Sequence, residues 1–301
     1  MPRLSVCIPL FNKAPYLERC FSHIESQNMS DFEVVVVDNA STDNPHPILE
    51  SWASRLPLRV FHLPVTLSIH ESWAFTLGYA QGEIRQLHSA DDYLAEGALK
   101  KVVAAFGEAH TLDYVIGRTL TIMDDGTSVT DPAVLDYHAR LEVWRSCIHP
   151  SLTLKDKALF LASMNLGQNF FGDANPLFMR AHCVDFIRKA ARTTAPLFHI
   201  VPDLEIYLKL YTQFQGTYLP EDTIYCTVNE SSTYQLTRGN PDLALISYEI
   251  PALNALAFLS LHPLFRQVNR AMGPAPLFRR WLGFTKRLLK PSIKSLLKKS
   301  H

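Results

Sequence analysis

Short apolar runs alternate with amphipathic segments over residues 4–92 of the chain. Leu4–Leu10 is a largely apolar run, and Phe32–Val37 is a β-branched run of the kind found in parallel strands that are covered on both faces. Between them, apolar residues recur at helical spacing: Tyr16, Leu17, Cys20, Phe21 and Ile24. A third strand over 58–63, a helix over 71–80 and a short strand directly before Asp91 and Asp92 continue the pattern. This alternation predicts an α/β fold with a doubly wound, mostly parallel sheet.

Polar loops follow three of these predicted strands. They are Pro9–Asn12, Asp38–Asp43 and the pair Asp91 and Asp92. Because such sheets bind ligands at the carboxyl ends of their strands, we expect the three loops to meet at one edge.

Asp91 and Asp92 are the most informative residues of this edge. Adjacent carboxylates raise each other's pKa unless something neutralises them. A divalent cation does so well, since hard ions take carboxylate oxygens and often keep substrate phosphates as further ligands. The alternative is a turn that caps the next helix, at Glu96–Leu99. The two polar loops upstream favour the metal site.

Three sequence blocks resemble family 2 glycosyltransferases. Ser5–Asn12 is similar to their opening strand, Glu33–Asp43 to their second strand and loop, and Leu67–Asp92 to their third block. The blocks occur in the order and at the spacing of that family. The resemblance implies a GT-A fold, a Rossmann-like sheet flanked by helices.

The resemblance also implies an inverting sugar transfer from a nucleotide-sugar, with uridine favoured as the base. Asp91 would hold Mn²⁺ or Mg²⁺ on the diphosphate, supported by Asp92. The residues implied to bind the nucleotide-sugar are Pro9, Leu10, Phe11, Asn12, Asp38, Asn39, Ser41, Ser89, Ala90 and Asp91.

One residue departs from the family pattern. The usual Asp-x-Asp would place a carboxylate where Ser89 stands. A serine hydroxyl can hydrogen-bond ribose or a metal-bound water, but it supplies no charge. This leaves open a catalytically impaired sugar-nucleotide-binding subunit. A nucleotidyltransferase is a weaker alternative, because it would need a glycine-rich basic loop where residues 9–12 stand.

The second half of the chain supplies the predicted acceptor side. Residues 172–175 form a loop that we expect to be a wall of the site. Asp203 begins a segment of helical spacing, so it can serve as a helix cap. The resemblance instead places the catalytic acidic residue here, and a carboxylate within reach of an acceptor hydroxyl can act as its base. Asp203 is our candidate base and Glu205 the fallback.

The length and composition are those of one long globular domain with an appendage. We divide the chain into a glycosyltransferase domain over 1–240, with a nucleotide-binding half (1–106) and an acceptor half (107–240), and an extension over 241–301. Five scattered cysteines, an N-terminus that enters a strand at once and the lack of a long apolar run favour a cytoplasmic location.

Charge is distributed unevenly although Lys/Arg and Asp/Glu both number 29. Ten of the basic residues and none of the acidic ones follow Glu249, beside Trp281, Phe284 and several leucines. Such a basic amphipathic helix is typical of an anionic membrane surface, here the inner face of the plasma membrane. The alternative is a helix packed on the acidic body. Nucleic acid is a poorer partner, since the body supplies no matching basic face.

These features together predict a metal-dependent glycosyltransferase. Its donor is a nucleotide-diphosphate-sugar, and its acceptor is a hydroxyl of a saccharide or lipid-linked saccharide in surface polysaccharide synthesis.

Overall fold

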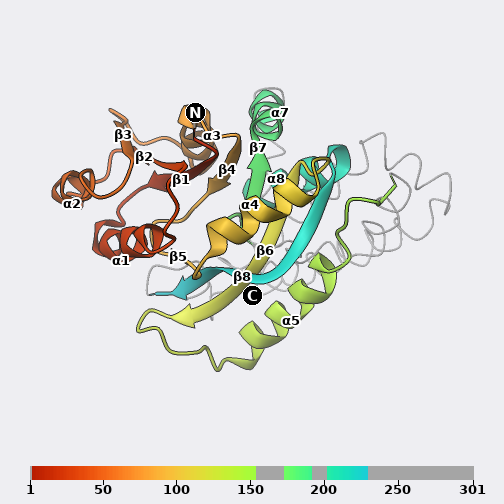
Figure 1. The fold of residues 1–301 in the computed structure, drawn as a ribbon. Coiled ribbons are helices and arrows are strands. Elements are labelled where there is room, and N and C mark those ends of the chain that lie inside the picture. Colours follow the sequence, from red (N-terminus) through yellow and green to blue (C-terminus); the bar gives the residue numbers. More distant parts are fainter. Residues whose placement is uncertain (1, 154–172, 192–201, 230–301) are drawn as a thin grey trace, which may run out of the picture.

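One mixed sheet organises the part of the chain that the computed structural model describes, residues 2–153, 173–191 and 202–229 (Figure 1). Its strands are β1 (Leu4–Leu10), β2 (Phe32–Asp38), β3 (Leu58–His62), β4 (Ile84–Leu87), β5 (Tyr93–Leu94), β6 (Tyr114–Met123), β7 (Leu177–Arg180) and β8 (Gly216–Val228). The helices around it are α1 (Ala14–Glu25), α2 (His46–Trp52), α3 (Ile69–Tyr79), α4 (Ala98–Glu108), α5 (Pro132–Arg145), α7 (Ala181–Ala191) and α8 (Pro202–Gln213).

The first half of the chain forms the parallel part of the sheet. Its strands lie in the order β3-β2-β1-β4, and every neighbouring pair among them is parallel. The α/β fold predicted from the alternating apolar runs is therefore confirmed. Because parallel strands share one direction, the polar loops after β1, β2 and β4 lie at the same edge.

The second half of the chain extends this sheet rather than forming one of its own. β7 pairs antiparallel with both β4 and β6, and β8 pairs parallel with β6 and antiparallel with β5. The predicted boundary between residues 106 and 107 thus separates two stretches of sequence that share a single sheet. The extension over 241–301 lies outside the described residues.

Helices cover both faces of the sheet, because alternate strand residues point to opposite sides. Val6 and Ile8 of β1 pack into a cluster with α1, α2 and α4, whereas Cys7 packs into a second cluster with α3, α7 and α8. Both faces of β1 are therefore buried, as its apolar sequence predicts. This rigid layer fixes where the carboxyl ends of β1, β2 and β4 lie.

The helix α3 begins two residues before the predicted start. Ser68 accepts a hydrogen bond from the backbone of Glu71, and the Glu71 carboxylate accepts one from the backbone amide of Ser68. This reciprocal cap stabilises the first turn and places it directly after the loop that follows β3.

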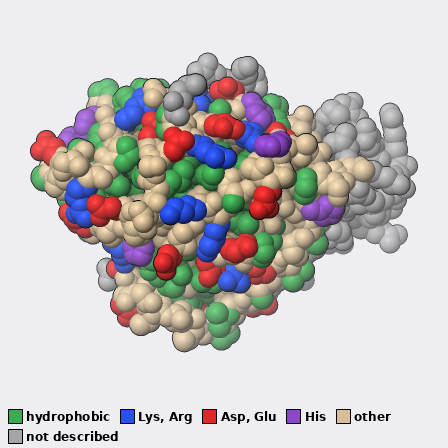
Figure 2. Space-filling view, viewed as in Figure 1, with side chains coloured by type: hydrophobic (Ala, Val, Ile, Leu, Met, Phe, Trp, Pro, Cys, Tyr) green, Lys and Arg blue, Asp and Glu red, His purple; other side chains and the backbone are tan. Residues whose placement is uncertain are grey.

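In the described part of the chain, no helix has both the length and the apolar character that a membrane crossing needs. Figure 2 shows acidic and basic side chains interspersed on one face of the molecule.

Gly82 occupies a crowded position beside the start of β1. Its amide donates a hydrogen bond to the Ser5 hydroxyl, which in turn donates to the buried carboxylate of Glu33. A Cβ atom at Gly82 would lie 2.6 Å from the Ser5 oxygen and 2.7 Å from the Ser5 backbone nitrogen.

We expect Gly82→Ala to lower the free energy of unfolding by about 1–3 kcal/mol, because backbone atoms cannot move aside cheaply. Gly107→Ala is the matched control, since its nearest atom is the end of a flexible arginine 3.8 Å away. Urea denaturation should show the control unchanged or up to about 1 kcal/mol more stable. Equal stability of the two variants would contradict the crowding of Gly82.

Candidate active site

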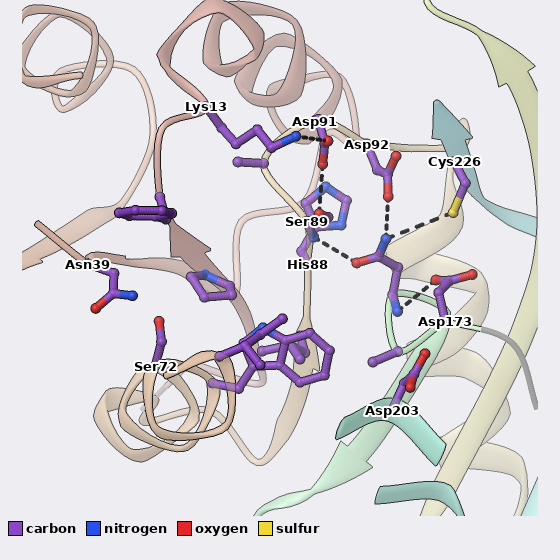
Figure 3. Close-up of a pocket in the computed structure, with 18 of the residues that line it drawn as sticks. Lys13, Asn39, Ser72, His88, Ser89, Asp91, Asp92, Asp173, Asp203 and Cys226 are labelled. Atoms are coloured by element: carbon purple, nitrogen blue, oxygen red, sulfur yellow. Dashed lines mark hydrogen bonds and ion pairs between the residues drawn. The ribbon is translucent and has the colours of Figure 1, made fainter. Parts of the chain in front are cut away.

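A cavity of about 720 Å³ opens at the carboxyl edge of the parallel strands. This volume lies within the usual range for small-molecule sites. The first half of the chain contributes one wall through Pro9, Phe11, Lys13, Asn39, Thr66, Leu67, Ile69, Ser72, Trp73 and residues 87–92. The second half contributes the other wall through Asp173, Ala174, Asn175, Asp203, Cys226 and Thr227. Figure 3 shows most of these residues around the cavity.

The cavity gathers eight of the predicted site residues. They are Pro9, Phe11, Asn39, Ser89, Ala90, Asp91, Asp92 and Asp203. The predicted wall over 172–175 also lies here through its described residues 173–175.

Four predicted nucleotide-binding residues are not among those that line the cavity. Leu10 is fully buried in the core. The Asn12 amide donates to the Ser41 hydroxyl at 3.0 Å, so these two residues join the loops after β1 and β2. Asp38 is buried, and one of its oxygens accepts the Ser41 amide at 3.0 Å while the other faces His62. These residues shape the loops behind the cavity wall.

Asp91 is a carboxylate of the cavity wall with three side-chain partners. One oxygen accepts a hydrogen bond from the Lys13 ammonium at 2.6 Å and another from the Asn229 amide at 3.2 Å, and the other oxygen accepts the Ser89 hydroxyl at 2.7 Å. Burial alone would raise the pKa of Asp91, but the Lys13 charge and these hydrogen bonds hold that pKa below its usual value. The carboxylate is therefore ionised at neutral pH and balanced by one cation (Figure 3).

Asp92 has a different environment although it adjoins Asp91. Its Oδ1 accepts the backbone amide of Thr227 at 2.7 Å, and its Oδ2 accepts the side-chain amide of Asn175. Burial and the charge of Asp91 raise the pKa of Asp92 well above its usual value. The sequence predicts Asp92 as a supporting metal ligand, whereas the described contacts commit both of its oxygens to protein donors. Asp92 thus positions the turn that carries Asp91.

Asn175 of the predicted wall and Thr227, which the sequence did not indicate, complete this turn. Asn175 accepts the Ser89 amide at 2.7 Å through its side-chain oxygen. The Thr227 hydroxyl donates to the backbone carbonyl of Asp91 at 2.7 Å. The predicted wall pointed to the region of Asn175, but Thr227 lies in an ordinary strand sequence and has no motif of its own.

His88 is also part of the cavity lining, although its sequence context gave it no role. Its ring is fully buried, and its Nε2 has no hydrogen-bond partner in the described structure. Burial lowers the pKa of His88 to about 4, so the ring is neutral at physiological pH. A neutral imidazole beside Ser89 adds polarity to this wall without adding charge.

Asp203 reaches the cavity from the first turn of α8. Its side chain is partly exposed, and Figure 3 shows it beside Asp173, on the side of the cavity away from Lys13. In the same helix, the Tyr207 hydroxyl donates to the backbone carbonyl of Asp173 at 2.8 Å, which fixes α8 against this loop. Glu205 belongs to α8 as well, but its side chain lies outside the described residues.

The oxygen donors around Asp91 fit a hard divalent cation. An ionised carboxylate and the neighbouring Ser89 hydroxyl are ligands that Mg²⁺ or Mn²⁺ accepts, with water and substrate phosphates completing the shell. The Lys13 ammonium already contacts one oxygen of this carboxylate, at 2.6 Å. Since Ser89 supplies no charge, Asp91 is the one ionised ligand that we assign to such an ion.

The fold is an α/β sheet with the GT-A arrangement, and the cavity lies at the carboxyl edge of its parallel strands. The chain belongs to Glycosyl transferase family 2, whose sequence profile matches residues 5–155. The resemblance noted from the three sequence blocks is thereby confirmed.

Curated relatives match less than half of the chain. A PGL/p-HBAD biosynthesis glycosyltransferase of Mycobacterium bovis is 33% identical over 118 residues, which cover 38% of this chain and 46% of the relative. The poly(ribitol-phosphate) beta-N-acetylglucosaminyltransferase TarS of Staphylococcus aureus is 31% identical over 114 residues, which cover 37% of this chain and 20% of the relative. The matches span less than half of either relative.

Solved structures show that the likeness in fold extends further. S. aureus TarS 1-349 in complex with UDP-GlcNAc superimposes with a TM-score of 0.58 at 19% identity, over 94% of this chain and 79% of that one. Mannosyltransferase PcManGT from Pyrobaculum calidifontis, in complex with GDP-Man and Mn²⁺, gives a TM-score of 0.54 at 17% identity, over 99% and 88%. At such identities the superpositions establish the GT-A fold and no more.

We expect Asp92→Asn to lower the free energy of unfolding by about 1–3 kcal/mol, because the new amide group would face the donors of Thr227 or Asn175 and leave a buried polar group unpaired. Asp185→Asn, at an exposed position of α7, is the control and should change stability by less than about 0.5 kcal/mol. Chemical denaturation measures both. An Asp92→Asn protein as stable as wild type would show that Asp92 does not hold the turn.

Proposed function

We propose that this chain is an inverting, metal-dependent glycosyltransferase that moves a sugar from a nucleotide-diphosphate-sugar to a hydroxyl acceptor. The observation that carries the proposal is the pair of carboxylates Asp91 and Asp203 on opposite walls of one cavity. One is ionised and paired with Lys13, and the other comes from the half of the chain expected to receive the acceptor.

The donor's nucleoside is expected between the loops after β1 and β2. Pro9 and Phe11 offer apolar surface there, and Phe11 is 46% exposed, so its ring is available to a base. Asn39 is fixed by two hydrogen bonds with the backbone of Leu67, at 2.8 and 3.0 Å, and so holds the opposite lip of the cavity. The TarS complexes with UDP-GlcNAc and UDP favour uridine as the base.

The diphosphate is expected at Asp91 and Lys13. Asp91 would hold a Mn²⁺ or Mg²⁺ ion, which when bound neutralises the diphosphate as it leaves the sugar. The Lys13 ammonium lines the same cavity and can donate to phosphate oxygens while it remains near Asp91. The PcManGT complex with GDP-Man and Mn²⁺ supports this choice of cation.

The acceptor hydroxyl is expected on the side of Asp203. The oxygen of the acceptor hydroxyl forms a bond to the anomeric carbon of the sugar. The bond from that carbon to the phosphate oxygen breaks on the opposite face, and the nucleoside diphosphate leaves with the electron pair. The hydroxyl proton passes to the Asp203 carboxylate, which acts as general base. Attack opposite the leaving group inverts the anomeric centre, and Glu205 is the alternative base.

The acceptor is proposed to be a saccharide or a lipid-linked saccharide of surface polysaccharide synthesis. The relatives support this class of acceptor, since their names place them in PGL/p-HBAD biosynthesis or describe them as acting on poly(ribitol-phosphate). The basic extension after Glu249 would keep the enzyme on the inner face of the plasma membrane, where such acceptors are anchored. A cytoplasmic, peripheral location follows from this proposal.

A catalytically impaired nucleotide-sugar-binding subunit is the second candidate, because Ser89 replaces a carboxylate in the metal motif. Release of UDP from a UDP-sugar in the presence of Mn²⁺ separates the two proposals. A nucleotidyltransferase is less well supported, since Asn12 and Lys13 follow β1 without the glycine-rich loop that such enzymes need.

Asp91→Asn should abolish the Mn²⁺-dependent part of UDP-sugar binding, because a neutral amide of almost the same size is a poor ligand for a hard cation. Calorimetry of UDP binding with Mn²⁺ and with EDTA measures the change. Asp185→Asn on α7 is the control and should bind as wild type does. Retention of Mn²⁺-dependent binding by Asp91→Asn would remove Asp91 from the metal site.

Asp203→Asn should lower UDP release from the preferred donor by about 100-fold or more, since loss of a general base typically has that effect. The affinity for UDP should stay the same, because Asp203 lies on the acceptor wall. Glu205→Gln is assayed beside it. An unchanged rate with a lower melting temperature would make Asp203 a helix cap, and a rate loss confined to Glu205→Gln would move the base there.

The full-length chain should co-sediment with vesicles that contain anionic lipid at low salt, and added salt should release it. Vesicles of zwitterionic lipid alone are the control. Protein that stays in the supernatant with both kinds of vesicle would end the membrane proposal and favour an extension packed on the acidic body.

A further inference from the structure

Three potential metal ligands converge outside the cavity, at the carboxyl edge of the sheet. Asp38 ends β2, His62 ends β3, and the strand register places these two residues side by side. His46 is the first residue of α2, after the loop that leaves β2. The three side chains therefore come from separate elements, and the paired strands hold two of them in place.

The ligand atoms of this group lie close together. The Nδ1 of His62 is 3.4 Å from the Oδ2 of Asp38, and the Nε2 of His46 is 4.0 Å from the same oxygen. The imidazole rings of His46 and His62 stack with their centroids 4.4 Å apart. All three ligand atoms lie within 4.8 Å of one another. A tetrahedral ion with bonds of about 2.0–2.2 Å needs separations of about 3.3–3.6 Å, so a small rotation of the histidines closes the set.

The carboxylate is already oriented for such a role. Asp38 is 3% exposed, and its Oδ1 accepts the backbone amide of Ser41 at 3.0 Å, which leaves Oδ2 directed at the histidines. The two imidazole side chains are about half exposed, so they can turn and an ion can reach them from solvent. In metal sites, a hydrogen bond to the second oxygen of a carboxylate often orients the oxygen that binds the ion. The Ser41 amide holds Asp38 in this way.

We propose that Asp38, His46 and His62 form a binding site for a borderline transition-metal ion, with Zn²⁺ the favoured occupant. Two imidazole nitrogens and one carboxylate oxygen are ligands that Zn²⁺, Co²⁺, Ni²⁺ or Cu²⁺ prefers over Mg²⁺. Three protein ligands leave a coordination position for water. This site differs in donor chemistry from the oxygen ligands at Asp91, and it does not depend on the proposed transferase activity.

A second group among the described residues is less suited to metal. Asp113, His182 and Cys183 also place their ligand atoms within 4.8 Å of one another. However, burial raises the pKa of the Cys183 thiol well above its usual value, and metals bind the thiolate. The first group offers two imidazole nitrogens and a carboxylate oxygen instead, and none of its ligand atoms is a thiol.

An ion at this site would join β2, β3 and α2. The residue after Asp38 is Asn39, which lines the cavity, and the loop between β2 and α2 carries Asp43, whose carboxylate accepts the Ala14 amide at 2.7 Å. Fixing both ends of this loop should make the folded state more stable in proportion to the ion's affinity.

The test is Zn²⁺ binding by the full-length chain without a histidine tag. Calorimetry, and metal analysis after dialysis, should show that His46→Ala and His62→Ala each lose one bound Zn²⁺ equivalent, with affinity at this site falling by at least about 100-fold. His110→Ala, at an exposed position after α4, is the matched control and should bind as wild type does. In EDTA, the melting temperature should be the same for wild type, the two site variants and the control. Added Zn²⁺ should raise the melting temperature of wild type and of the control alone.

A second measurement needs no variant. Co²⁺ added to the wild-type chain should give the visible absorption bands of a four-coordinate ion, and Zn²⁺ should remove them. The proposal is overturned if wild type shows neither Zn²⁺ binding nor these bands. It is also overturned if both histidine variants bind as much Zn²⁺ as the control, in which case His62 and Asp38 are a hydrogen-bonded pair and no more.

Discussion

The buried carboxylate of Asp92 joins three parts of the chain that are far apart in sequence. It accepts hydrogen bonds from the Thr227 amide in β8 and from the Asn175 side chain before β7, while the turn after β4 carries it. A carboxylate buried without such partners is strongly unfavourable, so the turn, the loop and β8 have to assemble together. Once they do, Ser89 is fixed by Asn175 and Asp91 is directed into the cavity. The geometry of the site depends on this arrangement.

The two neighbouring carboxylates consequently have different chemical roles. Asp91 is held ionised by the Lys13 ammonium and by hydrogen bonds, whereas burial and the charge of Asp91 raise the pKa of Asp92. Two neighbouring carboxyl groups often take different roles in this way, because their environments push their pKa values apart. The serine at position 89 fits this scheme, because it donates a hydrogen bond to Asp91 and adds no further negative charge.

The parallel half of the sheet gives its carboxyl edge two sets of ligands with different chemistry. Inside the cavity, Asp91 offers carboxylate oxygens, which are ligands of the kind that hard cations accept. One strand pair further along the edge, Asp38 adjoins the imidazoles of His46 and His62. Both sets exist for the same reason: strands that share a direction end together, and polar residues follow where the apolar core ends. The antiparallel strands of the second half then close one side of the cavity.

The sequence by itself determined the parallel half of the fold and the edge at which the site lies. Continuous apolar runs such as Phe32–Val37 can only be buried on both faces, and polar residues directly after them have to lie at the strand ends. Seven of the predicted site residues line the cavity for this reason. The helical spacing of apolar residues after Asp203 also predicts the start of α8, and this helix brings Asp203 to the same cavity.

Only the tertiary structure decided how those residues divide their roles. Strand periodicity gives no indication that Thr227 and Asn175 satisfy Asp92, because these contacts span 135 and 83 residues of sequence. Nor does it indicate that Asp38 turns away from the cavity toward His46 and His62, since the direction of a side chain after a strand depends on the neighbouring loop. Hydrophobic patterning acts over a few residues and fixes elements. Burial, charge pairing and hydrogen-bond partners arise from long-range packing, and they fix the chemistry.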